Sequence, residues 1–157
     1  MLDNIEKWID ETLEKYSRER TSCEVFAEKF TGFYPVEFLN SCYFVVVDEI
    51  PKPDFPELHE MGLTDFIEMD VDGITYKNTY FIKKGFETDY RLHFHELVHV
   101  LQWQLLGAQS FIQRYIQEIN MHGYRNAPLE KMAYGLDSYF AAGQKPANIP
   151  AFVQMKI

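Results

Sequence analysis

The residues of this chain best suited to chemistry are His95, Glu96 and His99, which form the pattern H-E-x-x-H. Residues four apart lie on one face of a helix, so the imidazoles of His95 and His99 can reach one metal ion. Glu96 lies about 100° further around the same helix. Its carboxylate then stands beside the open coordination position of the metal, where it can accept a proton from bound water. The pattern predicts most of a zinc hydrolase site in one short segment.

The residues around this pattern favour a helix. The segment 91–106 contains no Pro or Gly and is rich in apolar residues, which indicates a largely buried helix rather than a strand. Thr88 can cap its start, Asp89 suits the positive end of the helix dipole, and Gly107 can end it. The alternative is a set of structural histidines paired with Glu96 or with backbone. Burying these polar side chains on an apolar helix would be costly without a strong partner such as a metal ion.

The third metal ligand is predicted on a later helix. Gln102 and Leu105 stand where a metzincin would carry Gly and His, so that class of zincin is excluded. Residues 126–137 have the features of a helix, with Asn126 as a good N-cap. Glu130 then lies one turn into this helix and can supply a carboxylate ligand.

These two segments together resemble a known family. The pattern H-E-L-V-H-V-L-Q-W, followed by N-A-P-L-E-K-M-A-Y, resembles the gluzincin metallopeptidases. The similarity is greatest to the very small minigluzincins and to small bacterial H-E-L-x-H-V-x-Q peptidase-like domains, and it is strongest over residues 72–137. The resemblance implies Glu96 as general base and three zinc ligands, which are His95, His99 and Glu130.

One position departs from the family pattern. The larger gluzincins often carry an Asp four residues after the third ligand, where it supports a ligand histidine. This chain has Tyr134 at that position, and the nearest Asp is Asp137. The orientation of the ligand histidines depends on such partners, because they fix the tautomer and the ring angle.

The predicted reaction is hydrolysis of a peptide bond by a zinc-bound water that Glu96 activates, with endopeptidase action favoured over exopeptidase action. A hydroxyl group can stabilise the developing oxyanion. Tyr124, in the connection before the third ligand, is the first choice, with Tyr115 and Tyr134 as alternatives. The alternative function is a metal-binding domain with little or no peptidase activity that serves as an interaction or assembly module. Glu96 favours the enzyme, because structural zinc needs no base.

Other polar residues near the motif receive ordinary interpretations. His93 should point away from the metal face and lie at the surface or at the helix start. His122 is the one histidine that can replace Glu130 as third ligand. Gln102 shares the face of the ligand histidines, where it can line the site or contact backbone. His59 belongs to no motif.

Composition limits the classes of partner that the protein is expected to bind. A chain of 157 residues is normally one domain. A net charge of −9 argues against nucleic acid and provides no basic stripe for an anionic membrane. Two cysteines, Cys23 and Cys42, fit a reducing compartment. No signal peptide or membrane-length apolar run is visible, so we expect a cytoplasmic protein that acts on a peptide or protein substrate. The sequence indicates no oligomeric state.

The predicted fold is α+β and zincin-like, in a single domain over residues 1–157. A small, twisted, mostly antiparallel or mixed sheet of three or four strands follows an N-terminal helix and precedes the H-E-x-x-H helix, and C-terminal helices carry the third ligand. The expected segments are N-terminal helices over 1–40, the sheet over 42–83, the active-site helix over 88–106, a connecting helix over 110–122, the third-ligand helix over 127–142 and an irregular tail over 143–157.

Two strand predictions and the tail bear on the substrate cleft. Residues 66–69 are interpreted as a second strand after 43–47. Resemblance to gluzincins implies that 73–76 is an edge strand whose free backbone groups pair with an extended peptide, with a plain hairpin arm as the alternative. Small gluzincins include latent forms, so residues 143–157 are expected either as a loosely docked terminus or as a segment that blocks the cleft.

Overall fold

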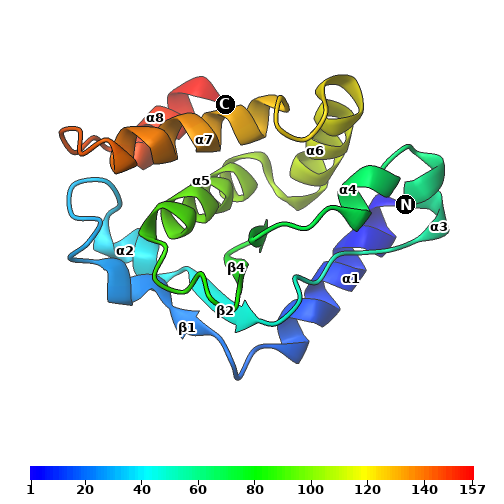
Figure 1. Cartoon of the computed structure of the whole chain (residues 1–157), viewed down its shortest axis with the longest axis horizontal. Helices are drawn as coiled ribbons and strands as arrows, with labels where there is room; N and C mark the ends of the chain where they lie inside the picture. Colours follow the sequence, from blue (N-terminus) through cyan, green and yellow to red (C-terminus); the bar gives the residue numbers. More distant parts are fainter.

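The computed structural model describes residues 1–157 as eight α-helices, one short 3-10 helix and four strands, which confirms the α+β class (Figure 1). The elements in chain order are α1 (Leu2–Lys15), β1 (Thr21–Ser22), η1 (Cys23–Phe26), α2 (Val36–Asn40), β2 (Tyr43–Val47), α3 (Pro56–Glu60), α4 (Thr64–Glu68), β3 (Gly73–Tyr76), β4 (Thr79–Lys83), α5 (Tyr90–Leu106), α6 (Ala108–His122), α7 (Pro128–Ala141) and α8 (Ile149–Lys156).

The sheet is mixed and places β3 at an edge. Its strand order is β1-β2-β4-β3, with β2 parallel to β4 and the other two pairs antiparallel. Strands β3 and β4 form the predicted hairpin, in which Ile74 lies opposite Phe81 and Thr75 opposite Tyr80. The expectation that residues 73–76 form an edge strand is therefore confirmed.

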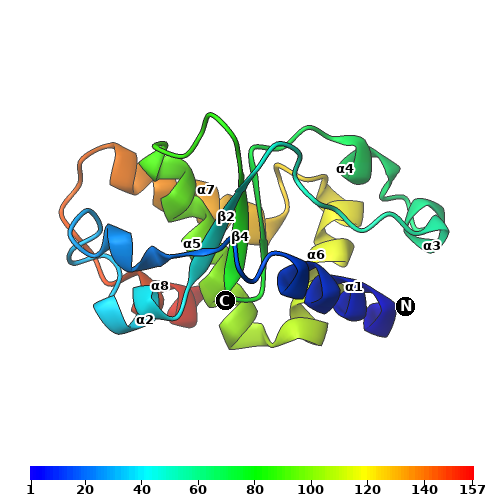
Figure 2. The same cartoon turned by 90° about the horizontal axis from the view of Figure 1, so that it is seen from below.

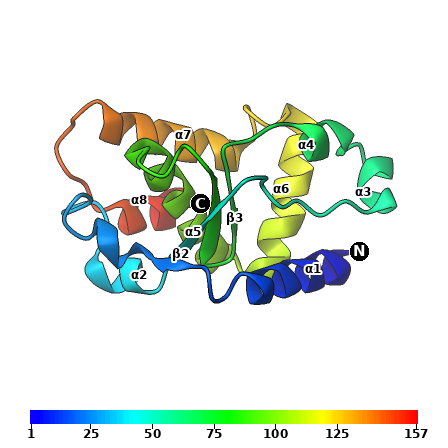
Figure 3. The same cartoon turned by 60° about the horizontal axis from the view of Figure 1, so that its bottom comes forward.

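Helix α5 lies in the middle of the molecule, between the sheet and helices α7 and α8 (Figure 1). Figures 2 and 3 show α1, α3, α4 and α6 at one end and α2 with α8 at the other. Every residue of α5 from His93 to Trp103 is buried. An apolar sequence suits this position, but any polar side chain on α5 must find its partner inside the protein.

Two hydrophobic clusters fill the space on either side of the sheet. Alternate residues of β4 point to opposite faces, so Tyr80 and Ile82 join one cluster while Phe81 joins the other. The first cluster packs α5, α7 and α8 together, with Phe94 stacked on Phe140 at 4.7 Å. The second packs α1, α3 and α6 around Trp103. No helix is both long enough and apolar enough to cross a membrane.

The predicted strand at 66–69 is wrong, because these residues lie in and just after helix α4. A four-residue apolar run is too short for its periodicity to separate strand from helix. The structure shows what decides the matter. The ammonium of Lys52 donates hydrogen bonds to the backbone oxygens of Phe66 and Met69, and these close the end of the helical turn.

The predicted irregular tail at 143–157 is also wrong, because most of it is helix α8. Asn148 caps this helix by accepting a hydrogen bond from the Ala151 N–H at 3.0 Å. Ile149 and Val153, one turn apart, are buried against the first cluster. The helix forms because a cap and an apolar pair occur together, a signal that the sequence contains. It packs on the core and does not line the cleft beside the metal ligands.

We expect Ile149→Ala to lower the free energy of unfolding by about 2–5 kcal/mol, the usual result of truncating a large buried aliphatic side chain. Ile149 is 1% exposed, whereas Met155 on the same helix is 71% exposed. The control Met155→Ala should change stability by less than about 0.5 kcal/mol. Urea denaturation measures both. Equal small effects would show that α8 does not dock on the core.

Candidate metal centre

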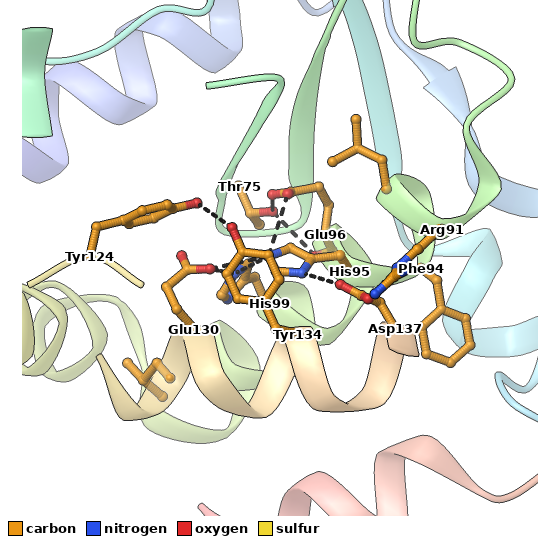
Figure 4. A network of polar contacts seen from close by, with 12 residues as sticks. Thr75, Arg91, Phe94, His95, Glu96, His99, Tyr124, Glu130, Tyr134 and Asp137 are labelled. Carbon is orange, nitrogen blue, oxygen red and sulfur yellow. Dashed lines mark hydrogen bonds and ion pairs between the residues drawn. The ribbon is translucent and has the colours of Figure 1, made fainter. Parts of the chain in front are cut away.

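Three side chains converge between helices α5 and α7 (Figure 4). The Nε2 atoms of His95 and His99 are 3.2 Å apart. The Oε1 atom of Glu130 lies 3.1 Å from the first nitrogen and 3.2 Å from the second. All three residues are buried, and together they can hold a metal ion. The structure therefore brings together the three residues that the sequence indicated as ligands.

The position of Glu130 is fixed by the peptide groups on either side of Leu129. The Leu129 N–H donates to Glu118 Oε1 at 2.7 Å, and the Leu129 carbonyl accepts from Gln102 Nε2 at 3.0 Å. Helices α6 and α5 thus hold the first turn of α7 from two sides. Glu118, rather than the predicted Asn126, does the capping, since the side chain of Asn126 makes no cap hydrogen bond.

Each ligand histidine has a partner that fixes its ring. His95 Nδ1 lies 2.8 Å from Asp137 Oδ2, and His99 Nδ1 lies 2.7 Å from Gln102 Oε1. Both partners are acceptors, so each Nδ1 carries the proton and each Nε2 is free to bind a metal. Arg91 in turn holds the other oxygen of Asp137 at 2.6 Å. Asp137, rather than a residue at position 134, is therefore the carboxylate that supports His95.

The charges at the centre shift one another's pKa values when no metal is bound. Burial lowers the pKa of both imidazoles, but the hydrogen bonds that His95 donates to Asp137 and Glu130 outweigh this, and the pKa of His95 lies well above its usual value. The charge of Glu130 likewise raises the pKa of His99 against the effect of burial. Burial raises the pKa of Glu130, but the two imidazoles hold it well below its usual value. In the metal-free protein, protons on the imidazoles thus take the place of the cation.

Glu96 lies beside the three ligands without belonging to them. The Thr75 hydroxyl donates to Glu96 Oε1 at 2.8 Å, while Glu96 Oε2 stands 3.9 Å from His95 Nε2. Burial raises the pKa of Glu96, and the neighbouring imidazoles offset this only in part. Gly73 of β3 lies so close that a Cβ there would be 3.2 Å from Glu96 Oε2. Glu96 is therefore held between α5 and β3 with one oxygen free of protein donors.

The tyrosine hydroxyls divide into two roles. Tyr115 donates to Glu130 Oε2 at 2.5 Å, so it supports a ligand and is not free to serve an oxyanion. Tyr124 and Tyr134 have hydroxyls 3.4 Å apart, and the Tyr134 ring lies 4.5 Å from the His95 ring. Figure 4 shows Tyr124 reaching toward the centre from beyond Glu130. Burial, and to a smaller extent the charge of Glu130, raises the pKa of Tyr124. The hydroxyl therefore stays protonated and can donate a hydrogen bond.

The remaining histidines are not ligands. His93 points away from the metal face and lies in the first turn of α5, as expected, but it does not lie at the surface. It is fully buried, with Nδ1 2.8 Å from the Tyr80 hydroxyl and Nε2 2.8 Å from the Glu87 carbonyl.

His122 is exposed and contributes no atom to the centre. His59 lies between Asp54 and Thr64. The cap of α5 is Asp89 rather than Thr88, through the Leu92 N–H at 3.1 Å.

Two hollows meet at the centre. One is a chamber of about 90 Å³ in which 15 of the 21 lining residues are hydrophobic, and it reaches Glu96, His99 and Glu130. The other is a larger groove of about 770 Å³ with mostly polar walls, and it reaches His95 and Glu96. Tyr124 lines both. An extended molecule can therefore pass over the metal ligands with one part in an apolar space and the other in a polar one.

A scan against protein-family models, a search of curated proteins and a search of solved structures each gave no match for this chain. The chemistry of the centre is therefore inferred from its own geometry.

We expect the protein to bind one divalent metal ion per chain, and Asp137→Asn to weaken this binding about 10- to 100-fold, because the partner of a ligand histidine sets its basicity and orientation. Calorimetric titration with zinc measures both. Asp10→Asn is the matched control, since Asp10 pairs with Lys77 at the surface and its loss should leave the affinity unchanged.

The same titration should show affinity that rises with pH. Because the pKa values of His95 and His99 are raised in the metal-free protein, a bound proton competes with the metal until the pH exceeds those values. Metal binding near neutral pH should therefore release protons into the buffer. An affinity independent of pH, or unchanged in Asp137→Asn, would contradict this set of ligands.

Proposed function

We propose that this protein is a zinc-dependent metallopeptidase of the gluzincin type that hydrolyses peptide bonds in the interior of a chain. The observation that carries the proposal is the triangle formed by two imidazole nitrogens and one carboxylate oxygen, with edges of 3.1, 3.2 and 3.2 Å. In a regular tetrahedron with bonds of about 2.0–2.1 Å to zinc, ligand atoms lie about 3.3 Å apart. Three ligands of this kind leave one position for water or substrate, as catalytic zinc requires.

The residues around the triangle fit hydrolysis. Zinc, when bound, polarises the peptide carbonyl and lowers the pKa of water toward neutrality. Glu96 accepts a proton from the attacking water at its free Oε2 atom and passes it to the nitrogen of the leaving amine as the C–N bond breaks. Thr75 holds the other carboxylate oxygen, so the base keeps one orientation. The hydroxyl of Tyr124 donates to the oxyanion that forms on the carbonyl oxygen.

The edge strand supports a peptide substrate. The Lys83 N–H donates to the Asp72 carbonyl at 2.8 Å, which makes these two residues a hydrogen-bonded pair at the start of the β3–β4 hairpin. By the alternation of antiparallel pairing, the backbone groups of Gly73 and Thr75 point away from β4. They are free to pair with an extended peptide directly beside Glu96. A small molecule has no extended backbone that could pair with these groups.

The second candidate function is a metal-binding module without peptidase activity, which would bind a partner through the same cleft. A structural metal needs ligands alone. Here the carboxylate of Glu96, which is not among the three ligands, is buried beside them. It accepts a hydrogen bond from the Thr75 hydroxyl and lies close to Gly73. Burying such a group has a cost in stability, and a chemical role for Glu96 would account for it. This observation favours the enzyme.

We expect Glu96→Gln to bind zinc as the wild type does and to lower the rate of peptide cleavage about 100- to 10,000-fold, because the base is lost while the ligands remain. Cleavage of a denatured protein is followed by mass spectrometry, with zinc content measured in parallel. Glu11→Gln, a change on the exposed face of α1, is the control and should retain activity. A wild-type protein that holds zinc, binds a peptide and never cleaves it would favour the module.

We expect Tyr124→Phe to lower kcat about 100-fold with little change in KM, since a donor to the oxyanion acts only in the transition state. Tyr115→Phe is the comparison, because its hydroxyl contacts Glu130 and its loss should instead weaken zinc binding. Steady-state kinetics on one peptide, together with zinc titration, separates the two. If Tyr134→Phe loses kcat and Tyr124→Phe does not, the donor is Tyr134.

A further inference from the structure

We infer that the apolar chamber beside the metal ligands binds the large hydrophobic side chain, such as Phe, Leu or Met, of the substrate residue on the amino side of the bond that is cleaved. The inference rests on the proposed peptidase function and adds to it a substrate class. It depends on the shape of the chamber, on its polarity and on the direction of strand β3.

The chamber begins at the metal ligands and ends one helical turn away. Trp103 follows His99 by four residues on the same face of α5, which corresponds to a rise of about 6 Å. Its indole stacks on Phe111 at 4.2 Å, and Phe111 stacks on Tyr115 at 5.5 Å, so an aromatic wall runs back to Glu130. A depth of about 6 Å suits a side chain that extends through several bonds of about 1.5 Å each.

The space is too large to be an ordinary packing defect. Protein interiors contain few voids larger than a water molecule. A volume of about 90 Å³ accommodates several waters, since each needs about 10–15 Å³ by this measure. Apolar walls from α1, α4 and α6 offer these waters few hydrogen bonds, and the side chains involved include Ile9, Ile67 and Ile116. Replacing such water by a hydrophobic side chain is favourable.

Polar and charged side chains fit the chamber badly. Its two carboxylates, Glu96 and Glu130, lie at the end next to the metal ligands, where Thr75 and Tyr115 are bound to them. The one buried side-chain polar atom without a partner in the whole chain is Trp103 Nε1, which belongs to a residue of the chamber wall. It is a donor, so it offers nothing to the ammonium of a lysine. A charged side chain would lose its hydration in the apolar part of the chamber, where this single N–H is the one free partner.

The direction of β3 decides which substrate residue enters. Of the two hollows, Ile74 to Tyr76 line only the chamber, and Asp70 and Asp72 line only the polar groove. Val71 and Gly73 line both. Antiparallel pairing is the commoner and slightly more stable arrangement. A peptide that pairs antiparallel to β3 lies with its amino-terminal part toward Tyr76. Its residues before the cleaved bond therefore meet the chamber, and those after it meet the groove.

The test is to compare two peptides that differ only in Phe or Ala on the amino side of the cleaved bond. The wild type should cleave the Phe peptide with a kcat/KM at least about tenfold higher. Ile116→Phe fills the chamber from α6 and should remove this preference, so that the ratio of kcat/KM between the Phe and Ala peptides falls to about one. Ile67→Phe, which fills the chamber from α4, provides a second route if the first variant folds poorly.

The matched control is Ile119→Phe. Ile119 is half-buried on the same helix but does not line the chamber, so its substitution should retain the preference for Phe. Cleavage that is indifferent to the residue on the amino side, or a preference that survives filling the chamber, overturns the inference and leaves the peptidase intact. A metal-loaded wild type that cleaves neither these peptides nor a denatured protein overturns the proposed function and the role of the chamber together.

Discussion

The whole arrangement depends on one constraint, which is that α5 is buried on every side and still carries a polar face. His95, Glu96 and His99 are each no more than 4% exposed. In the low-dielectric interior of the protein, a buried polar side chain destabilises the fold unless each of its polar atoms has a partner. The partners come from β3, from α7 and from α5 itself, and α6 supports them through the Tyr115 hydroxyl on Glu130. The edge strand, the connecting helix and the third-ligand helix are thus positioned by the same set of contacts that would serve catalysis.

The same constraint explains why the centre favours a positive charge. Glu130 and Asp137 face the imidazole of His95 from opposite sides of the ring. Two carboxylates favour a positive charge between them, whether a proton or a metal ion supplies it. A buried ion pair of this kind adds little to stability on balance, but removing one partner is severely destabilising. The site is therefore better understood as prepared for a cation than as a stabilising element of the core.

Apart from helix α8, whose local signals were missed, sequence predicted the features that depend on local spacing and missed those that depend on contacts between distant segments. The ligands on α5 follow from the period of a helix, and Glu130 from a short motif with a helix start. The burial of His93 did not follow, because the aromatic side chains around it come from η1 and β2. The clamp on Leu129 by Gln102 and Glu118 joins three helices, and no local pattern encodes it. Asp137 was visible as the nearest candidate, but only the packing of α7 on α5 shows that it reaches His95.

The clamp on Leu129 also joins the metal centre to a part of the molecule that touches no ligand. Arg114 binds Glu118 Oε2 at 2.8 Å and the Ile157 carbonyl at 3.0 Å. The docking of α8 is thereby coupled, through one guanidinium and one carboxylate, to the peptide that precedes Glu130. Fraying of that last helix would loosen the grip on the cation, and occupancy by the cation would in turn hold the helix in place. Metal binding and the docking of α8 would then be thermodynamically coupled.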